Sequence, residues 1–408
     1  PFNFNNYNAD LATVKAKYLQ VIEAGVRQIA LLEDDATGSS AANLSRLLND
    51  LTDWLTDLKK NKYSDLKTDI LYCPNDYMGN GSSAKLKGIN ASANRQVHMV
   101  MTGNAVWGQV SANFADNFYN NVASNGVAGR YPYMWVNWPC NDNYKTGLIM
   151  GGHNTILHTG IDGRKYEGII LNPMQHSEPS KVAIFTAADY CWKPWDAKEE
   201  GDQAWEDSFK YIDHVTALES DSSKALREVA KHMIYQGPVQ TAGRQAKFEE
   251  SVDLKNKLAE IQKKVEAGTV TTAELDDMRN EFKTIYDAAV KYLTDGTNKR
   301  LSEQMTPFLA CLRDECEADI ELMDALKAVQ TKENDKVWEH YSAAQTLYER
   351  SRTYGFRYVN ETKYATAGLL YIVPFTEKVM KNVSDTVKQI IDPEHIKLER
   401  TLIYRVGG

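Results

Sequence analysis

Two adjacent carboxylates, Asp34 and Asp35, follow a short apolar run, Ile29–Leu32, with Glu33 between the run and the pair. At the end of a strand the backbone turns, so neighbouring side chains can converge. Two close carboxylates cannot both ionise easily, and their pKa values are pushed apart. One then stays charged while the other keeps a proton, as acid/base catalysis requires. The same pattern also fits a solvated acidic turn or a helix N-terminal cluster.

Further polar and aromatic groups follow four other apolar runs. They are Cys73 with Tyr77, Thr102, Trp135 and Asn137 with Asp142, and Asn172. Amide, carboxyl and hydroxyl groups suit sugar hydroxyls, and an aromatic ring covers the apolar face of a sugar. Taken singly, each residue is better explained as a satisfied buried polar group or a core aromatic. Taken together, their positions indicate a sugar-binding site.

The elements that must position these groups are short apolar runs without strict alternation. They cover residues 27–32, 69–74, 96–102, 133–137 and 166–172. Such runs are typical of parallel strands buried on both faces. A helix is expected over residues 41–58, where five leucines share one face. Polar residues at the carboxyl ends of successive strands indicate a (β/α) barrel, which carries its chemistry at that end.

The second half of the chain has a helical pattern from about residue 203. Thr271 and Glu274 match a capping box, and apolar residues follow at alternating spacings of three and four. Further helices are expected over residues 301–326, 333–351 and 374–391, which together indicate a helical bundle. We therefore expect three parts: residues 1–200 in the α/β fold, 201–390 in the bundle, and 391–408 at the start of a further segment.

Composition narrows the classes of function. The 408 residues carry 47 Lys and Arg against 55 Asp and Glu, a net charge of −8. Without a basic run, the chain lacks the electrostatic footprint of a nucleic-acid-binding protein. No run of 18 apolar residues predicts a membrane span. The five Cys and eight His show no metal-ligand spacing, so no metal or cofactor is expected.

A family resemblance rests on six motifs in a fixed order. They are Ile29-Ala-Leu-Leu-Glu-Asp-Asp35, Cys73-Pro-Asn-Asp-Tyr77, Met101-Thr-Gly103, Trp135-Val-Asn-Trp-Pro-Cys-Asn-Asp142, Asn172-Pro-Met-Gln-His-Ser-Glu-Pro-Ser-Lys181 and Thr186-Ala-Ala-Asp-Tyr-Cys-Trp192. The set resembles glycoside hydrolase family 84, which contains bacterial O-GlcNAcase-like enzymes, relatives named hyaluronidase, and animal O-GlcNAcases. The helical half resembles the bundle that follows the barrel in the bacterial members. The resemblance covers nearly the whole chain.

The resemblance implies a retaining exo-β-N-acetylglucosaminidase that uses substrate-assisted catalysis, an exception to the two-carboxylate scheme. The 2-acetamido oxygen of the substrate would attack the anomeric carbon and form an oxazoline. Asp34 would orient the acetamido N–H and accept its developing charge. Asp35 would protonate the leaving oxygen and then activate water.

The resemblance also assigns binding roles around the sugar. Tyr77 would assist at the acetamido group and the anomeric centre. Thr102 and Cys73 would line the acetamido pocket, with Trp135 as a wall and Asn137 as a polar neighbour. The remaining two residues, Asp142 and Asn172, would hold the outer hydroxyls. The expected partners are GlcNAc-terminated glycans or O-GlcNAc-modified proteins, and a bacterial parent would be secreted or held in the cell envelope.

Two departures from the family pattern stand out. Position 33 is Glu where the family usually has an apolar or aromatic residue, so a third carboxylate either raises the cost of ionising the pair or points away from it. The chain also matches only strands four to eight of the barrel. We therefore expect an N-terminal barrel portion outside this chain, because five strands cannot close a barrel.

Two alternatives to an enzyme stay open. A carbohydrate-binding or interaction protein with an inactive, incomplete barrel would also explain Glu33 and the missing strands. The helical bundle could instead be the functional part, as a docking or dimerisation surface.

Overall fold

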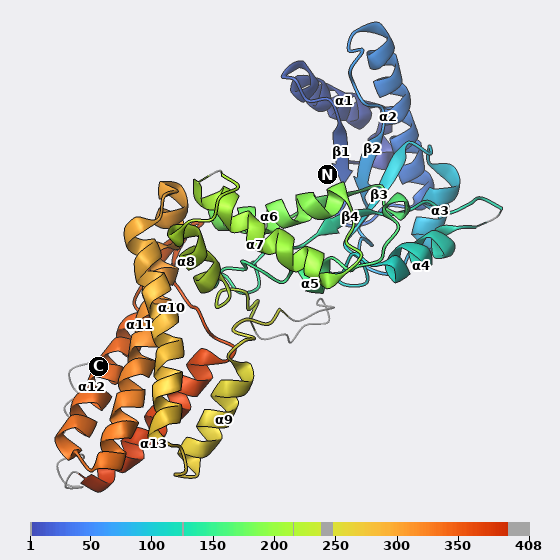
Figure 1. The fold of residues 1–408 in the computed structure, drawn as a ribbon. Coiled ribbons are helices and arrows are strands. Elements are labelled where there is room, and N and C mark those ends of the chain that lie inside the picture. The colour runs from blue at the N-terminus through green and yellow to red at the C-terminus, as the bar shows by residue number, and fades with distance from the viewer. Residues whose placement is uncertain (1, 125, 215, 238–247, 391–408) are drawn as a thin grey trace.

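The computed structural model of the chain describes residues 2–124, 126–214, 216–237 and 248–390 (Figure 1). An α/β region built from the first half leads into long helices built from the second half (Figure 1). Within the described ranges, no helix combines the length and apolar character needed to cross a membrane. The segment predicted to begin at residue 391 lies outside the described residues.

Five parallel strands form one sheet in chain order and confirm the predicted partial barrel. The strands are β1 (Ile29–Leu32), β2 (Ile70–Cys73), β3 (Val97–Met101), β4 (Tyr133–Val136) and β5 (Gly168–Leu171). Ile29 lies opposite Ile70, and Ile70 lies opposite Val97. This register brings the carboxyl ends of neighbouring strands to one rim, where the predicted chemical groups follow.

Helices alternate with these strands. They are α1 (Tyr7–Glu23), α2 (Ala41–Asn61), α3 (Ala84–Ser92), α4 (Ala112–Val122), α5 (His153–Ile156) and α6 (Ser177–Trp192), with short 3-10 turns at Phe4–Asn6 and Gly163–Lys165. Helix α2 begins where the Ser40 side chain accepts a hydrogen bond from Asn43 N. The five leucines predicted to share its inner face are all buried, which confirms that helix.

The sheet is open at both ends. In the described part of the chain, β1 pairs only with β2, and β5 pairs only with β4. Leu32 at the end of β1 is 52% exposed, and all four residues of β5 are partly exposed. Trp192, which ends α6 and lines a cavity with Ile169 of β5, is 93% exposed. The two open edges are therefore flanked by uncovered apolar side chains.

The second half forms the predicted helical region. Its helices are α7 (Lys198–His214), α8 (Asp221–Ala230), α9 (Lys255–Glu266), α10 (Thr272–Asp295), α11 (Lys299–Thr331), α12 (Asn334–Ser351) and α13 (Ile372–Ile390). Thr271 and Glu274 form the predicted capping box at the start of α10. The apolar residues at three- and four-residue spacing in α10 are buried, as are most of those in α11.

The sequence did not predict the antiparallel hairpin of β6 (Gly355–Tyr358) and β7 (Glu361–Tyr364). Its two-residue turn places Val359 in the left-handed region, with φ of 51°. Tight two-residue hairpin turns usually contain Asn-Gly or Asp-Gly, which makes them recognisable in a sequence. A β-branched residue at positive φ is a rare substitute, so the usual sequence signal is missing here.

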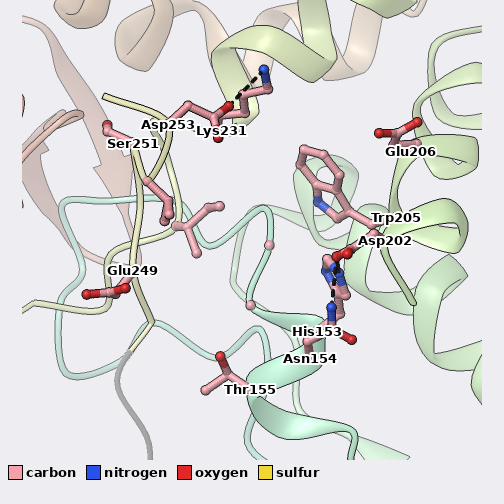
Figure 2. A pocket seen from close by; sticks show the side chains of 14 residues that line it. His153, Asn154, Thr155, Asp202, Trp205, Glu206, Lys231, Glu249, Ser251 and Asp253 are labelled. Atoms are coloured by element: carbon pink, nitrogen blue, oxygen red, sulfur yellow. Dashed lines mark hydrogen bonds and ion pairs between the residues drawn. The ribbon is translucent and has the colours of Figure 1, made fainter. Parts of the chain in front are cut away.

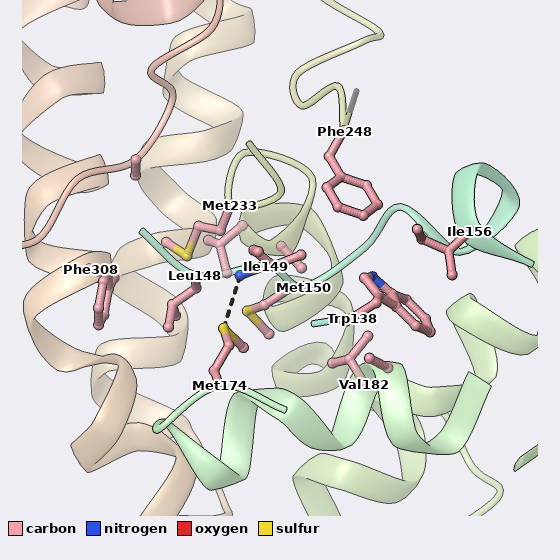
Figure 3. Close-up of a cluster of buried hydrophobic side chains, with 14 of the residues drawn as sticks. Trp138, Leu148, Ile149, Met150, Ile156, Met174, Val182, Met233, Phe248 and Phe308 are labelled. Carbon is pink, nitrogen blue, oxygen red and sulfur yellow. Dashed lines mark hydrogen bonds between the residues drawn. The ribbon is translucent and has the colours of Figure 1, made fainter. Parts of the chain in front are cut away.

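A cluster of buried apolar side chains joins the α/β region to the helices (Figure 3). Trp138 and Met150 come from the first half, and Phe308 comes from α11. His176 contacts the rings of Phe308 and Phe356 edge-on, and burial lowers its pKa to about 4. A neutral imidazole from the first half of the chain therefore packs against two aromatic rings from the second half.

A buried carboxyl group in α11 should make stability depend on pH. Glu315 is fully buried beside Cys311, Arg352, Ser351 and Glu250, and burial raises its pKa to about 8. The folded protein binds a proton at Glu315 more tightly than the unfolded chain does, and this proton binding stabilises the fold. The stabilisation is complete below the ordinary pKa of glutamate and is lost as the pH rises through 8. We expect Glu315→Gln to raise the free energy of unfolding by about 2 kcal/mol at pH 9.

Urea unfolding of both proteins at pH 5 and pH 9 measures this difference. The gap between variant and parent should be small at pH 5 and large at pH 9. Glu303→Gln changes an exposed residue of the same helix and serves as the control. Equal effects of Glu315→Gln at both pH values would contradict the prediction.

Candidate active site

A cavity of about 180 Å³ lies at the carboxyl ends of the strands. It is lined by Asp34, Asp35, Cys73, Tyr77, Thr102, Val106, Trp135, Asn137 and Asn172. Apart from Val106, every lining residue is one that the sequence singled out, and the structure brings them together from five strand ends. Asp142 is the one predicted site residue that does not line the cavity.

The carboxylate pair occupies a tight turn after β1. Glu33 N still donates to Cys73 O at 2.8 Å, which continues the pairing of β1 with β2. The chain then turns, with Ala36 N donating to Glu33 O at 3.1 Å. Asp35 adopts φ of 56°, a left-handed conformation that is unfavourable for residues other than glycine. This turn lets both carboxylates reach one cavity although they are adjacent in sequence.

Tyr77 holds one member of the pair. Its hydroxyl donates to Asp35 Oδ1 at 3.0 Å. Burial, followed by the contact with Asp35, raises the pKa of the phenol. Tyr77 therefore stays protonated and can act as a donor at the carboxylate.

The neighbouring thiol is not a nucleophile. Cys73 is buried, and burial together with the negative charges of Asp34, Asp35 and Glu33 raises its pKa to about 12. A thiolate is the reactive form of cysteine, and it is not populated at neutral pH under these conditions. Cys73 contributes a neutral wall to the cavity.

Glu33 points away from the cavity. Its Oε2 accepts hydrogen bonds from the Tyr72 hydroxyl at 2.5 Å and from Lys85 Nζ at 2.8 Å. Its Oε1 accepts one from Ser39 N at 3.0 Å. Of the two possibilities that the sequence left open for this residue, the structure supports the second.

The opposite wall is a network of amides around one oxygen. Asn137 Oδ1 accepts from Trp135 Nε1 at 3.0 Å and from Asn172 Nδ2 at 2.9 Å. Asn137 Nδ2 donates to Val106 O at 2.7 Å. These bonds fix the orientation of the Asn137 amide and hold the Trp135 indole as a rigid aromatic side of the cavity.

A tight loop after β3 supplies the remaining wall. Thr102 Oγ1 donates to Ala105 O at 2.8 Å, and Thr102 N donates to Tyr77 O at 2.9 Å. A Cβ atom at Gly108 would lie 2.2 Å from Thr102 O, so only glycine permits this close approach. The loop thereby presents Val106 to the cavity. No chemical signal in the sequence pointed to this apolar residue.

Asp142 contacts the hairpin rather than the cavity. The Tyr358 hydroxyl donates to Asp142 Oδ1 at 3.2 Å. The same hairpin binds the loop after β5, because Gln175 Nε2 donates to Arg357 O at 3.2 Å and Val359 N donates to Gln175 Oε1 at 2.9 Å. The predicted role of Asp142 toward outer hydroxyls stays a prediction.

A larger cavity, of about 470 Å³, lies elsewhere in the molecule (Figure 2). His153 Nε2 and Asp202 Oδ1 are 2.9 Å apart at its edge, and burial lowers the pKa of His153. Trp205, Lys231 and Asp253 also line it. None of the predicted site residues contributes to this cavity.

The described ranges contain no group of three or more His, Cys, Asp or Glu side chains placed to hold a metal ion. The arrangement of the smaller cavity instead offers two carboxylates, a phenol donor, fixed amides and an indole face. Such groups can transfer protons to and from a bound sugar.

Comparisons with known proteins agree with this geometry. A family model described as beta-N-acetylglucosaminidase matches residues 1–231, and one described as hyaluronidase post-catalytic domain-like matches residues 253–355.

Three solved structures share the fold. CpGH84D is 28% identical with a TM-score of 0.81, and the match covers 94% of this chain and 61% of that chain. CpGH84B is 22% identical with a TM-score of 0.73, covering 93% and 62%. A mutant of the Thermobaculum terrenum O-GlcNAc hydrolase is 16% identical with a TM-score of 0.67, covering 94% and 77%.

This chain therefore spans less than two thirds of the length of the first two structures. The family model of the α/β region nevertheless matches more than half of the chain. In agreement with the motifs that resemble glycoside hydrolase family 84, the chain belongs to the β-N-acetylglucosaminidase family.

Proposed function

We propose that the parent protein is a retaining exo-β-N-acetylglucosaminidase of the O-GlcNAcase type that uses the 2-acetamido group of its substrate as the nucleophile. The observation that carries this proposal is the convergence of Asp34, Asp35 and Tyr77 in one cavity with a fixed indole wall.

The division of labour follows from the positions of the two acids. Asp34 is half-buried and Asp35 is exposed and bonded to Tyr77. In the proposed mechanism Asp34 accepts the acetamido N–H as the acetamido oxygen attacks the anomeric carbon. Asp35 gives its proton to the leaving oxygen, and the oxazoline forms as the glycosidic bond breaks. Asp35 then takes a proton from a water molecule as that water attacks the anomeric carbon and opens the oxazoline, so the β configuration is retained.

We further propose that strands from an N-terminal portion of the parent protein pair with β1 and β5 and complete the site. Unpaired strand edges are an aggregation hazard that proteins normally cover. The exposed Leu32 and Trp192 beside these edges support such a covering. Residues 1–200 would then be the C-terminal part of the catalytic barrel and residues 201–390 its bundle. A secreted or envelope location for a bacterial parent belongs to the same proposal.

Hydrolysis of an aryl β-N-acetylglucosaminide tests the proposed function. We expect the full-length parent to release GlcNAc initially as the β anomer, measured by proton NMR, and residues 1–408 alone to show at least about 10²-fold lower kcat/KM, because part of the sugar pocket is missing. Release of the α anomer would contradict the retaining mechanism.

A non-catalytic carbohydrate-binding protein is the second candidate, and the open sheet edges favour it. Glu33 does not favour the binding protein, because its carboxylate lies outside the cavity and pairs with Lys85. Calorimetry with an oxazoline mimic separates the two functions. Tight binding with turnover supports the enzyme, whereas weak binding without turnover by the full-length protein supports the binding protein.

A further inference from the structure

An ion pair beside the carboxylate turn is largely shielded from water. Lys85 Nζ lies 2.8 Å from Glu33 Oε2, and the two side chains are 18% and 11% exposed. Removing one partner of such a pair leaves an uncompensated charge at a poorly solvated position. Each residue of the pair therefore compensates the charge of the other, in addition to making a direct contact with it.

Each bond of the Glu33 carboxylate connects a different part of the site. Ser39 N is at the far end of the turn that carries Asp34 and Asp35. Tyr72 lies on β2. Lys85 lies on α3 and also donates to Asn75 Oδ1 in the segment that leads to Tyr77. One carboxylate thus links the loop of the acid pair to the loop of their phenol donor.

The linked turn requires such external support. Asp35 has φ of 56°, a sparsely populated conformation for a non-glycine residue that persists where surrounding contacts impose it. A Cβ atom at Gly38 would overlap the Asn75 side chain. The turn and the Asn75 loop are therefore packed against each other at the point that Lys85 bonds.

Charge gives the pair a second role. Three consecutive carboxylates, Glu33, Asp34 and Asp35, occupy this turn, and Lys85 neutralises the first. The other titratable groups close to them are Tyr72, Cys73, Tyr77 and Asp76. Burial raises the pKa of Tyr72 and of Cys73 well above neutrality, so neither adds charge near pH 7. Lys85 is thus the cation that this carboxylate contacts.

We propose that Glu33 and Lys85 form a positioning pair that holds the turn of Asp34 and Asp35. Lys85 also keeps the negative charge of Glu33 from changing the protonation of these two residues. The proposal deepens the proposed function and rests on it. It makes Glu33 a positioning residue, because its side chain does not line the cavity.

Two single substitutions should shift the pH profile in opposite directions. Lys85→Met leaves the Glu33 charge unpaired, and a nearby negative charge raises the apparent pKa of the acid pair. Glu33→Gln leaves the Lys85 charge unpaired, and a nearby positive charge lowers it. We expect the acidic limb of kcat/KM in the full-length parent to move by about half a unit to one unit each way. The double substitution, which is neutral, should return it toward the parental position.

The matched control is Lys327→Met. Lys327 lies in the helical half and bridges Asp276 and Asp324 at 2.8 Å each, with 26% of its side chain exposed. The substitution Lys327→Met removes a comparable ion-paired lysine and leaves the turn of Asp34 and Asp35 unchanged. Thermal unfolding of all four variants shows which remain folded, and the double substitution keeps the test informative should a single variant unfold.

Amide hydrogen exchange provides a readout that needs no activity. Exchange at Ser39 N–H should be at least about five-fold faster in both single variants than in the parent, and unchanged in Lys327→Met, because the bond to Glu33 protects it. Exchange can confirm the holding role even if the parent shows no turnover, which would reject only the proposed function. Unchanged exchange, or pH profiles that move in the same direction in an active enzyme, would overturn the positioning pair.

Discussion

Replacing Asp35 by Asn is expected to lower kcat for the full-length parent by about 10²–10⁴-fold, the usual contribution of a positioned acid or base. Asp35 lies at the cavity with its Oδ1 bonded to Tyr77, and asparagine keeps the size of the side chain but cannot transfer a proton. The loss should depend on the leaving group. An acidic phenol departs without protonation, whereas a serine-linked sugar requires it.

The measurement is kcat/KM for a series of aryl β-N-acetylglucosaminides whose phenols differ in acidity. For Asp35→Asn the rate should fall steeply as the phenol becomes less acidic, while the parent shows a shallow dependence. Added azide, which attacks the oxazoline without a general base, should restore turnover of the most activated substrate. Asp53→Asn, on the exposed face of α2, is the control. A uniform loss across the series would show that Asp35 is not the proton donor.

Much of this site could be predicted because buried parallel strands and the polar residues at their ends leave a local signal in the sequence. Short apolar runs located all five strands, and polar side chains at their carboxyl ends located the cavity around Asp34, Thr102 and Asn137. Parallel strands in register necessarily share one rim. Local sequence therefore determined which groups come together.

The features that the sequence left undetermined depend on contacts between distant residues. Asp142 bonds Tyr358, which is 216 positions away in sequence, on a hairpin whose turn lacks the usual residues. The direction of Glu33 is set by Lys85, 52 positions away. Val106 reaches the cavity because a glycine permits a tight loop. Spacing along the chain carries none of this information.

Replacing Asp34 by Asn should cost about 10²–10³-fold in kcat, a typical loss when one group that stabilises developing charge is removed. Asp34 is proposed to accept the acetamido N–H as the oxazoline forms, and positive charge grows on that group during the step. An amide carbonyl still accepts the hydrogen bond but does not offset the charge. The interaction is therefore weakened in the transition state more than in the bound substrate.

The two acid variants should be distinguishable by the same substrate series. Asp34→Asn slows ring closure itself, so its loss should be similar for acidic and less acidic phenols, and azide should not restore it. Its affinity for an oxazoline mimic should fall by a similar factor, because the mimic reproduces the group whose charge Asp34 offsets. Calorimetry with the full-length parent and Asp34→Asn measures this. If azide rescued Asp34→Asn and not Asp35→Asn, the two roles would have to be exchanged, while the assignment of the pair to one catalytic cavity would stand.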